Sequence, residues 1–219
     1  MLTQQTLQFL ADLKVNNNKP WFDENKKRYT AAKENFQQLV GAVLTELAGF
    51  DTSLAHLEVK NCVFRINRDV RFSTDKSPYK TNFGASFSAG GKKIATAGYY
   101  MHIMPGESFF GGGFYMPEAE DLKRIRQEID YNFSEFQGII TEPNFVKQYG
   151  TLSVPEGMKL ARPPKGYTPD NEAIEFLKLK GFIATKSFTD VEVTNKQWVA
   201  KVVSAAKALQ PLIDFLNRR

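Results

Sequence analysis

The chain has 219 residues, 42% of them hydrophobic and 24% charged, which is the composition of an ordinary globular protein and excludes a disordered chain. No apolar run is long enough to span a bilayer, and the single cysteine, Cys62, excludes an intramolecular disulfide. The formal net charge is +5. Residues 1–15 have no basic region followed by an apolar core, so no signal peptide is predicted and the expected compartment is the cytoplasm.

The N-terminal quarter of the chain predicts two helices. Apolar residues at helical spacing over residues 7–13 mark a short amphipathic helix that ends at Asn16. A second, long helix is predicted from Pro20 to about Gly49, because proline is tolerated at the first helical position and an apolar stripe follows it.

From about Leu57 the apolar pattern changes toward a period of two, which indicates strands. Strands are predicted at 57–66, 82–89, 93–104 and 107–115, with turns at Gly90-Gly91 and Pro105-Gly106. Closing pairs of Ala89 with Lys92 and Met104 with Glu107 would place one set of side chains on a common face, and a one-residue slip would reverse this. That set is Phe83, Ala85, Phe87, Ile94, Thr96, Gly98, Tyr100, His102 and Phe109.

The remaining residues predict mainly helices. A helix begins at Pro117, shorter helices follow at 134–141 and 144–149, and the proline-rich stretch 151–169 is a surface loop. A helix at 170–180, an extended segment at 182–193 and a final helix from Thr194, disturbed at Pro211, complete the chain. The sequence therefore predicts one α+β domain over residues 1–219. In it an antiparallel β-meander of about four to six strands packs against N-terminal and C-terminal helices.

Most of the charge asymmetry lies in residues 60–80, here called the basic segment. It contains six basic and two acidic residues, a local net charge of +4, whereas the rest of the chain has 23 basic and 22 acidic residues. Guanidinium groups match the oxygens of phosphate and carboxylate. We therefore predict a site for a small phosphate- or carboxylate-bearing ligand. The predicted ligand-binding residues are Arg65, Arg68, Arg71, Lys76, Tyr79, Lys80 and His102.

Two other interpretations of the basic segment stay open. Its arginines could be neutralised by Asp69, Asp75 and Glu58, which would make the protein a scaffold or protein-interaction domain with an internally salt-bridged loop. Nucleic-acid binding is the lesser alternative, because no helix has a row of basic residues and no RNP or zinc-finger motif is present.

The sequence indicates neither a reaction nor a cofactor. The two histidines, His56 and His102, form no HxH or HExxH motif, so we expect no metal site. Cys62 lies in a predicted strand and is expected to be a buried, unreactive thiol. Gly111-Gly112-Gly113 lacks the strand-to-helix setting of a phosphate loop, so it predicts close packing or a bulge. No membrane contact is expected, and the oligomeric state is open.

Several motifs together are similar to one family. They are WF at 21–22, FRINRDVRFSTDKSPYKTN at 64–82, GYYMHI at 98–103, GGGFYMP at 111–117, PPKGY at 163–167 and LKLKGF at 177–182. The chain resembles, over essentially its whole length, the bacterial family catalogued as domain of unknown function 2461. The resemblance implies a single α+β domain without an assigned activity, and it identifies no catalytic residue.

Overall fold

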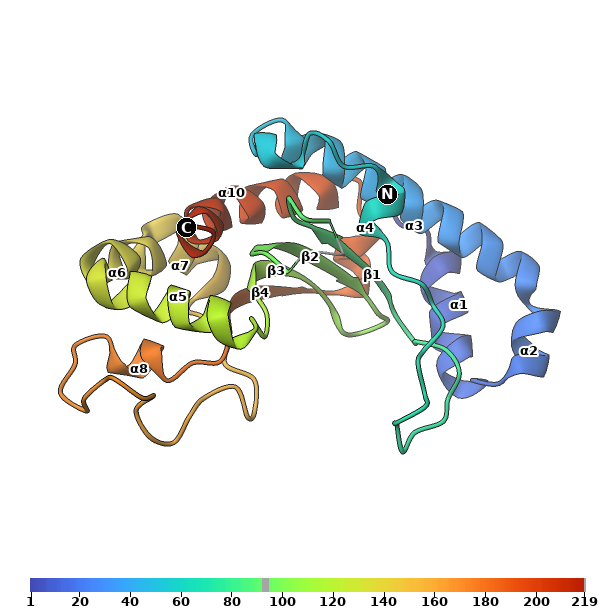
Figure 1. The fold of residues 1–219 in the computed structure, drawn as a ribbon. Coiled ribbons are helices and arrows are strands. Elements are labelled where there is room, and N and C mark those ends of the chain that lie inside the picture. The colour runs from blue at the N-terminus through green and yellow to red at the C-terminus, as the bar shows by residue number, and fades with distance from the viewer. Residues whose placement is uncertain (92–94, 219) are drawn as a thin grey trace. The chain divides into compact units, whose positions relative to one another are not determined.

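The computed structural model describes residues 1–91 and 95–218 and confirms the predicted α+β class. Its four strands form one antiparallel sheet in the order β1-β2-β3-β4, so strands that are consecutive in the chain are neighbours in the sheet (Figure 1). This is the predicted meander. The strands are β1 (Phe83–Phe87), β2 (Gly98–Ile103), β3 (Ser108–Phe114) and β4 (Phe182–Phe188).

The chain divides into two compact units, each built from several stretches. The first comprises Met1–Phe87, Tyr100–Phe110 and Ser187–Val203. The second comprises Ser88–Tyr99, Gly111–Lys186 and Ser204–Arg219. The expectation of a single domain over residues 1–219 stays a prediction.

The first unit contains the N-terminal helices. They are α1 (Gln4–Val15), α2 (Lys19–Glu24), α3 (Lys26–Ala48), the short 3-10 helix η1 (Thr52–Leu54) and α4 (Val59–Cys62), with α9 (Asp190–Val193) from later in the chain. Helices α1 and α3 lie side by side (Figure 1). Their apolar stripes are buried, as the helical spacing predicts.

The long helix predicted from Pro20 to Gly49 is interrupted, so that prediction is wrong at one point. Helices α2 and α3 meet at Asn25, where φ is −96° and ψ is 16°. The side-chain amide of Asn25 donates to the carbonyl of Trp21 at 2.9 Å. Asparagine bonds readily to nearby backbone groups in this way, which competes with a continuous helix.

The predicted strand 57–66 is also wrong in its first half. Residues 59–62 form α4, and the Asn61 side chain accepts a hydrogen bond from the backbone amide of Glu58 at 2.9 Å. This local cap favours a helical turn. In the second half of the predicted strand, Val63 forms an isolated antiparallel bridge with Ala85 of β1. Cys62 is buried, as predicted.

The predicted common face of the strands is wrong for β1. Phe83 stacks on Phe36 of α3, with ring centroids 5.1 Å apart, on the buried side of the sheet. Gly84 instead shares a face with Tyr100, because a Cβ at Gly84 would lie 2.6 Å from the Tyr100 hydroxyl. The proximity of Gly84 to Tyr100 shows that β1 faces β2 in a register other than the predicted one with Ala89 opposite Lys92, and an odd shift in register transfers every side chain of a strand to the other face. Strand β2 begins at Gly98, five residues later than predicted. Lys92 and Ile94 lie outside the described residues.

The turn between β2 and β3 is as predicted. The amide of Glu107 donates to the carbonyl of Met104 at 3.0 Å, and Gly106 has φ +77°, which suits the third position of a type II turn. The rings of Tyr100, His102 and Phe109 consequently lie on one face. Tyr99, Met101 and Ile103 are buried on the other.

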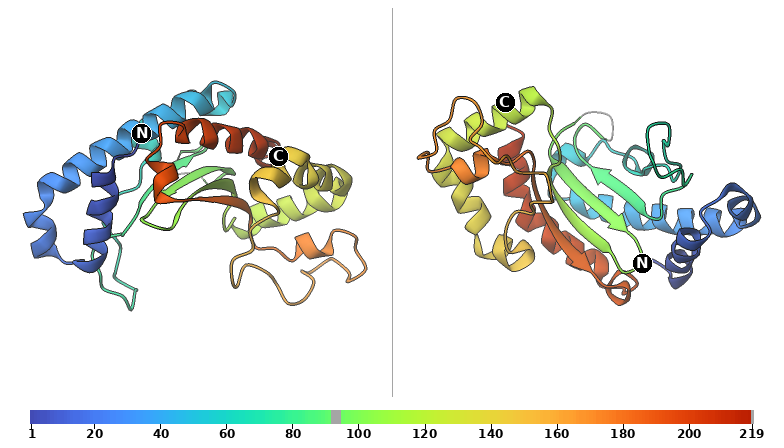
Figure 2. Two further views of the ribbon diagram at one scale, coloured as in Figure 1. Left: turned by 180° about the vertical axis from the view of Figure 1, so that it is seen from behind. Right: turned by 90° about the horizontal axis from the view of Figure 1, so that it is seen from below.

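The second unit contains α5 (Ala119–Tyr131), α6 (Phe133–Thr141), α7 (Pro143–Tyr149), α8 (Ile174–Leu177) and most of α10 (Trp198–Leu216). Figure 2 shows α5, α6 and α7 gathered beside the C-terminal half of α10. Phe136 of α6 packs between Phe176 and Phe215, at centroid distances of 5.2 and 5.4 Å. Helix α8 is shorter than the predicted helix 170–180, and α10 continues through Pro211 instead of restarting there.

The glycine run in β3 is a packing feature, as predicted. A Cβ at Gly111 would lie 2.3 Å from the carbonyl oxygen of Ala184, and one at Gly113, where φ is +117°, would lie 2.0 Å from that of Phe182. Side chains at these positions would therefore collide with the backbone of β4. The run lets two strands approach each other, and it does not form a phosphate cradle.

Candidate functional site

Residues 63–82, between α4 and β1, form a long loop with two arms within the first unit (Figure 1). The loop contains the whole basic segment except residues 60–62, which belong to α4. The amide of Lys80 donates to the carbonyl of Ile66 at 2.8 Å, and that of Arg68 donates to the carbonyl of Pro78 at 2.9 Å. We call residues 64–67 and 78–82, where the arms run side by side, the base of the loop. Residues 68–77 are its tip.

Tyr79 anchors the base. Its ring is 7% exposed and stacks on Phe22 of α2, with centroids 4.0 Å apart and planes at 15°. The side-chain amide of Asn17 donates to the Tyr79 carbonyl at 2.9 Å and accepts from the Tyr79 amide at 3.1 Å. Tyr79 was predicted to contact a ligand, but in the structure it joins the loop to the N-terminal helices.

Arg68 closes the tip. Its guanidinium donates to the carboxylate of Asp75, to the carbonyl of Ser77 at 3.1 Å and to the hydroxyl of Ser73 at 3.4 Å. Hydrogen bonds from Ser77, and then from Arg68, lower the pKa of Asp75 to about 2. The charge of Arg68 is therefore used within the loop.

The other two cations of the tip also have internal acceptors. Arg71 pairs with Asp69 at 2.7 Å, and this hydrogen bond lowers the pKa of the Asp69 carboxyl. The ammonium group of Lys76 donates to the carbonyl of Val70 at 3.0 Å. All three cations of the tip thus have acceptors within the loop.

Arg65 and Lys80, in the base, differ from the tip cations. Neither has a carboxylate within ion-pair distance among residues 1–91 and 95–218. The Lys80 ammonium lies over the ring of Phe64, 5.5 Å from its centroid. Burial, and then the positive charge of Arg65, lower the pKa of Lys80. Two neighbouring cations therefore lack a direct ion pair, although the charge of Arg65 contributes to lowering the pKa of the Asp69 carboxyl.

His102 lies on the partly exposed face of the sheet, with Asn82 and Tyr100 as neighbours. Its Nδ1 is 3.3 Å from the Tyr100 hydroxyl and 3.4 Å from Nδ2 of Asn82, and its ring stacks on Phe109 at 4.7 Å. Burial lowers the pKa of His102, although Glu107 acts in the opposite direction. If Nδ1 accepts from the Asn82 amide, the neutral form of the ring carries its proton on Nε2.

The structure leaves three of the predicted ligand-binding residues outside the internal pairs and the anchor of the loop. Arg65 and Lys80 are available in the base, and His102 is reached through a series of ring contacts that begins at Phe64. Arg68, Arg71, Lys76 and Tyr79 are occupied within the loop or at its anchor. Sequence reasoning missed Asn82 and Phe64, although both lie within the motif 64–82. The alternation in GYYMHI did place Tyr100 and His102 on one face.

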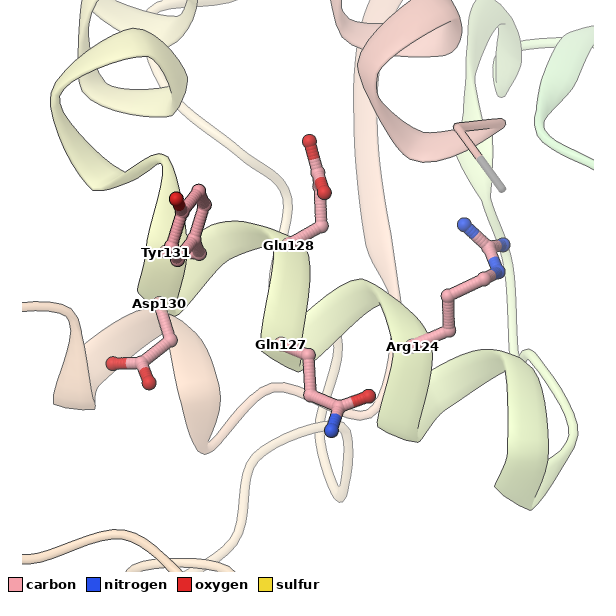
Figure 3. Close-up of a pocket in the computed structure, with 5 residues that line it drawn as sticks. All are labelled: Arg124, Gln127, Glu128, Asp130 and Tyr131. Atoms are coloured by element: carbon pink, nitrogen blue, oxygen red, sulfur yellow. The ribbon is translucent and has the colours of Figure 1, made fainter.

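A separate hollow of about 620 Å3 lies on α5 in the second unit (Figure 3). Arg124 and Glu128 point to the same side of α5, whereas Gln127 points away from them. Arg124 donates to the carbonyl of Leu216 at 3.1 Å, and Glu128 accepts from Arg218 at 3.1 Å. Arg124 and Glu128 therefore hold the C-terminal residues, while Asp130 accepts from the side-chain amide of Asn171 at 2.6 Å.

Two further features are absent from the part of the chain that the structure describes. No helix there is both long enough and apolar enough to cross a membrane. No group of three or more histidine, cysteine, aspartate or glutamate side chains there could hold a metal ion.

Comparison with known proteins supports the resemblance of the sequence motifs. The chain matches the model of a family described as conserved hypothetical protein (DUF2461) over residues 5–215, a range that includes the whole basic segment and all four strands. No match was found among curated proteins or among solved structures. The chain therefore belongs to the conserved hypothetical protein family DUF2461.

Proposed function

We propose that the protein binds a small phosphate- or carboxylate-bearing ligand whose anionic group contacts Arg65 and Lys80, with His102 as a hydrogen-bond donor to a part of the ligand farther from the anion. One observation supports this most directly. Of the six cations in the basic segment, Arg65 and Lys80 have no carboxylate within ion-pair distance and no carbonyl hydrogen bond among the described residues, while Lys60, Arg68 and Arg71 pair with carboxylates.

An anion would relieve the electrostatic cost of this arrangement. The two cations repel each other, and Lys80 is also partly removed from water, so the free protein holds two positive charges that no direct ion pair neutralises. A ligand anion beside both groups would reverse the sign of the local interaction. The planar fork of Arg65 suits two oxygens of a phosphate or a carboxylate, and Lys80 would add a point charge.

His102 would contribute a donor without adding charge. Its Nδ1 faces Asn82 and Tyr100, and accepting a hydrogen bond from either one would place the ring proton on Nε2, where it could be donated to a ligand. A neutral imidazole does not add to the repulsion between Arg65 and Lys80. This site binds a ligand, and we assign no reaction to it.

Titration calorimetry with inorganic phosphate and with acetate tests the proposal. Arg65→Ala is expected to weaken binding of the preferred anion about tenfold, because it removes a charge-assisted hydrogen-bonding group. Arg71→Ala is the matched control. It removes the same charge from the same segment, but Arg71 is already paired with Asp69, so we expect a change below about twofold.

Two outcomes would overturn the proposal. The first is that phosphate, acetate and the ring-bearing anions phenyl phosphate and benzoate all fail to bind. The second is that Arg65→Ala and Arg71→Ala weaken binding equally, which would indicate a diffuse response to net charge.

The internal pairing of the tip favours a second candidate function, that of a scaffold or protein-interaction domain. Phe72 is 95% exposed in this tip, although the loop around it is ordered by Arg68 and Asp75. In this case the basic segment would keep its shape for a protein partner. Arg68→Ala would then lower stability, and no small anion would restore it.

A further inference from the structure

Four aromatic side chains of the first unit form a continuous series on the partly exposed face of the sheet. Successive centroid distances are 6.3 Å from Phe64 to Tyr100, 5.8 Å from Tyr100 to Phe109 and 4.7 Å from Phe109 to His102. We call these four side chains the ring row. All four are half-buried, whereas Tyr99 and Phe110 on the opposite face are fully buried.

Packing and a polar contact within the sheet fix the positions of rings in the ring row. Gly84 on β1 leaves the room that the Tyr100 hydroxyl occupies, since a Cβ there would lie only 2.6 Å from it. The hydroxyl in turn lies 3.3 Å from Nδ1 of His102, which holds both rings in place. Partly exposed apolar groups that adjoin one another in this way mark binding surfaces more often than scattered exposed residues do.

The polar groups are divided between the two ends of the row. At the Phe64 end lies Lys80, over the ring, and Arg65 is near enough to Lys80 for its positive charge to act on that ammonium group. At the His102 end lie uncharged groups, among them the Asn82 amide at 3.4 Å from His102. A complementary ligand therefore has an anionic end, a flat apolar body and, beyond it, neutral hydrogen-bonding groups.

We infer that the ligand of this site carries its phosphate or carboxylate on a planar aromatic or heteroaromatic ring, and that this ring lies against the ring row. The inference rests on the proposed function, because Arg65 and Lys80 supply the attraction for the anion. Stacking on partly exposed aromatic side chains favours a flat ring over a saturated ring of similar size.

Matched pairs of probes test the inference on the full chain. Phenyl phosphate is compared with cyclohexyl phosphate, which has the same charged group but no flat ring, and with inorganic phosphate. Benzoate and cyclohexanecarboxylate form the equivalent pair for carboxylate. By calorimetry we expect the flat member of the preferred pair to bind about tenfold more tightly than the saturated member. The better pair identifies the anion.

Substitutions in the row separate stacking from general apolar contact. Phe109→Leu keeps an apolar side chain but removes the aromatic face, so the preference for the flat ring is expected to fall to below about threefold. Phe72→Leu is the matched control, because Phe72 is exposed and lies outside the row. It should leave the preference unchanged. Circular dichroism confirms that each variant is folded.

The possible results distinguish this inference from the proposed function. If the anions bind in an Arg65-dependent manner but flat and saturated rings bind equally, the ring inference is wrong and anion binding stands. If the flat-ring preference survives Phe109→Leu together with Phe64→Leu, the ring row is not the surface concerned and the inference is equally wrong. If none of the probes binds, both proposals fail.

Discussion

The tip and the base of the basic segment are both cationic, but they compensate their charge differently. In the tip, Arg68 and Arg71 pair with carboxylates, and Lys76 donates to a backbone carbonyl. In the base, Arg65 and Lys80 lack such partners among the described residues. The comparison teaches that density of basic residues does not locate a binding site. What counts is which charges the fold leaves uncompensated.

The largest effect is expected from removing the anchor of the base. Tyr79→Ala deletes a buried ring that stacks on Phe22, so we expect it to lower the free energy of unfolding by about 3 kcal/mol. Urea denaturation measures the change. Phe72→Ala removes an aromatic ring from the exposed tip and should cost less than about 0.5 kcal/mol. Equal costs for the two variants would show that the base is no better anchored than the tip.

An intermediate effect is expected from opening the tip. Arg68→Ala removes the hydrogen bonds to Asp75, Ser73 and the Ser77 carbonyl, and we expect a loss of about 1 kcal/mol in urea denaturation. If the tip and the base act separately, anion affinity should change by less than about twofold, because the base keeps both of its cations. A loss of affinity as large as that of Arg65→Ala would contradict the separation of tip from base.

The smallest effect is expected in the dependence of the protein's stability on pH at acidic pH. In the folded protein the pKa of Asp75 is lowered from 3.8 to about 2, so the unfolded chain binds more protons between these values. The stabilisation from Asp75 is therefore fully present above about pH 4 and is lost as the pH falls toward 2. Asp75→Asn removes this dependence.

Thermal melts of the wild type and Asp75→Asn from pH 2 to pH 6 check this expectation. The difference in Tm between the two proteins should be greatest at the upper end of the range and should shrink as the pH falls. A difference in Tm that stays constant across the range would show that the contribution of Asp75 to stability does not depend on its negative charge.

Much of the fold could be predicted from local patterns. Apolar spacing identified most of the helices, and the Pro105-Gly106 pair identified the turn between β2 and β3, since these signals depend on residues close together in the chain. The errors arose where a side chain competed locally or where register mattered. Asn25 breaks a helix, the Glu58–Asn61 cap replaces part of a strand, and the register between β1 and β2 puts Gly84, instead of Phe83, on the face of Tyr100.

The sequence by itself determined the α+β class, the family and the location of the cationic segment, because each depends on composition, periodicity or a long local motif. Only the tertiary structure decided which cations are compensated and which aromatic rings lie beside them. Those relations join residues that are far apart in the chain, such as Phe64 with Tyr100 and Tyr79 with Phe22. Charges and rings interact through space, and only the folded backbone sets the distances between them.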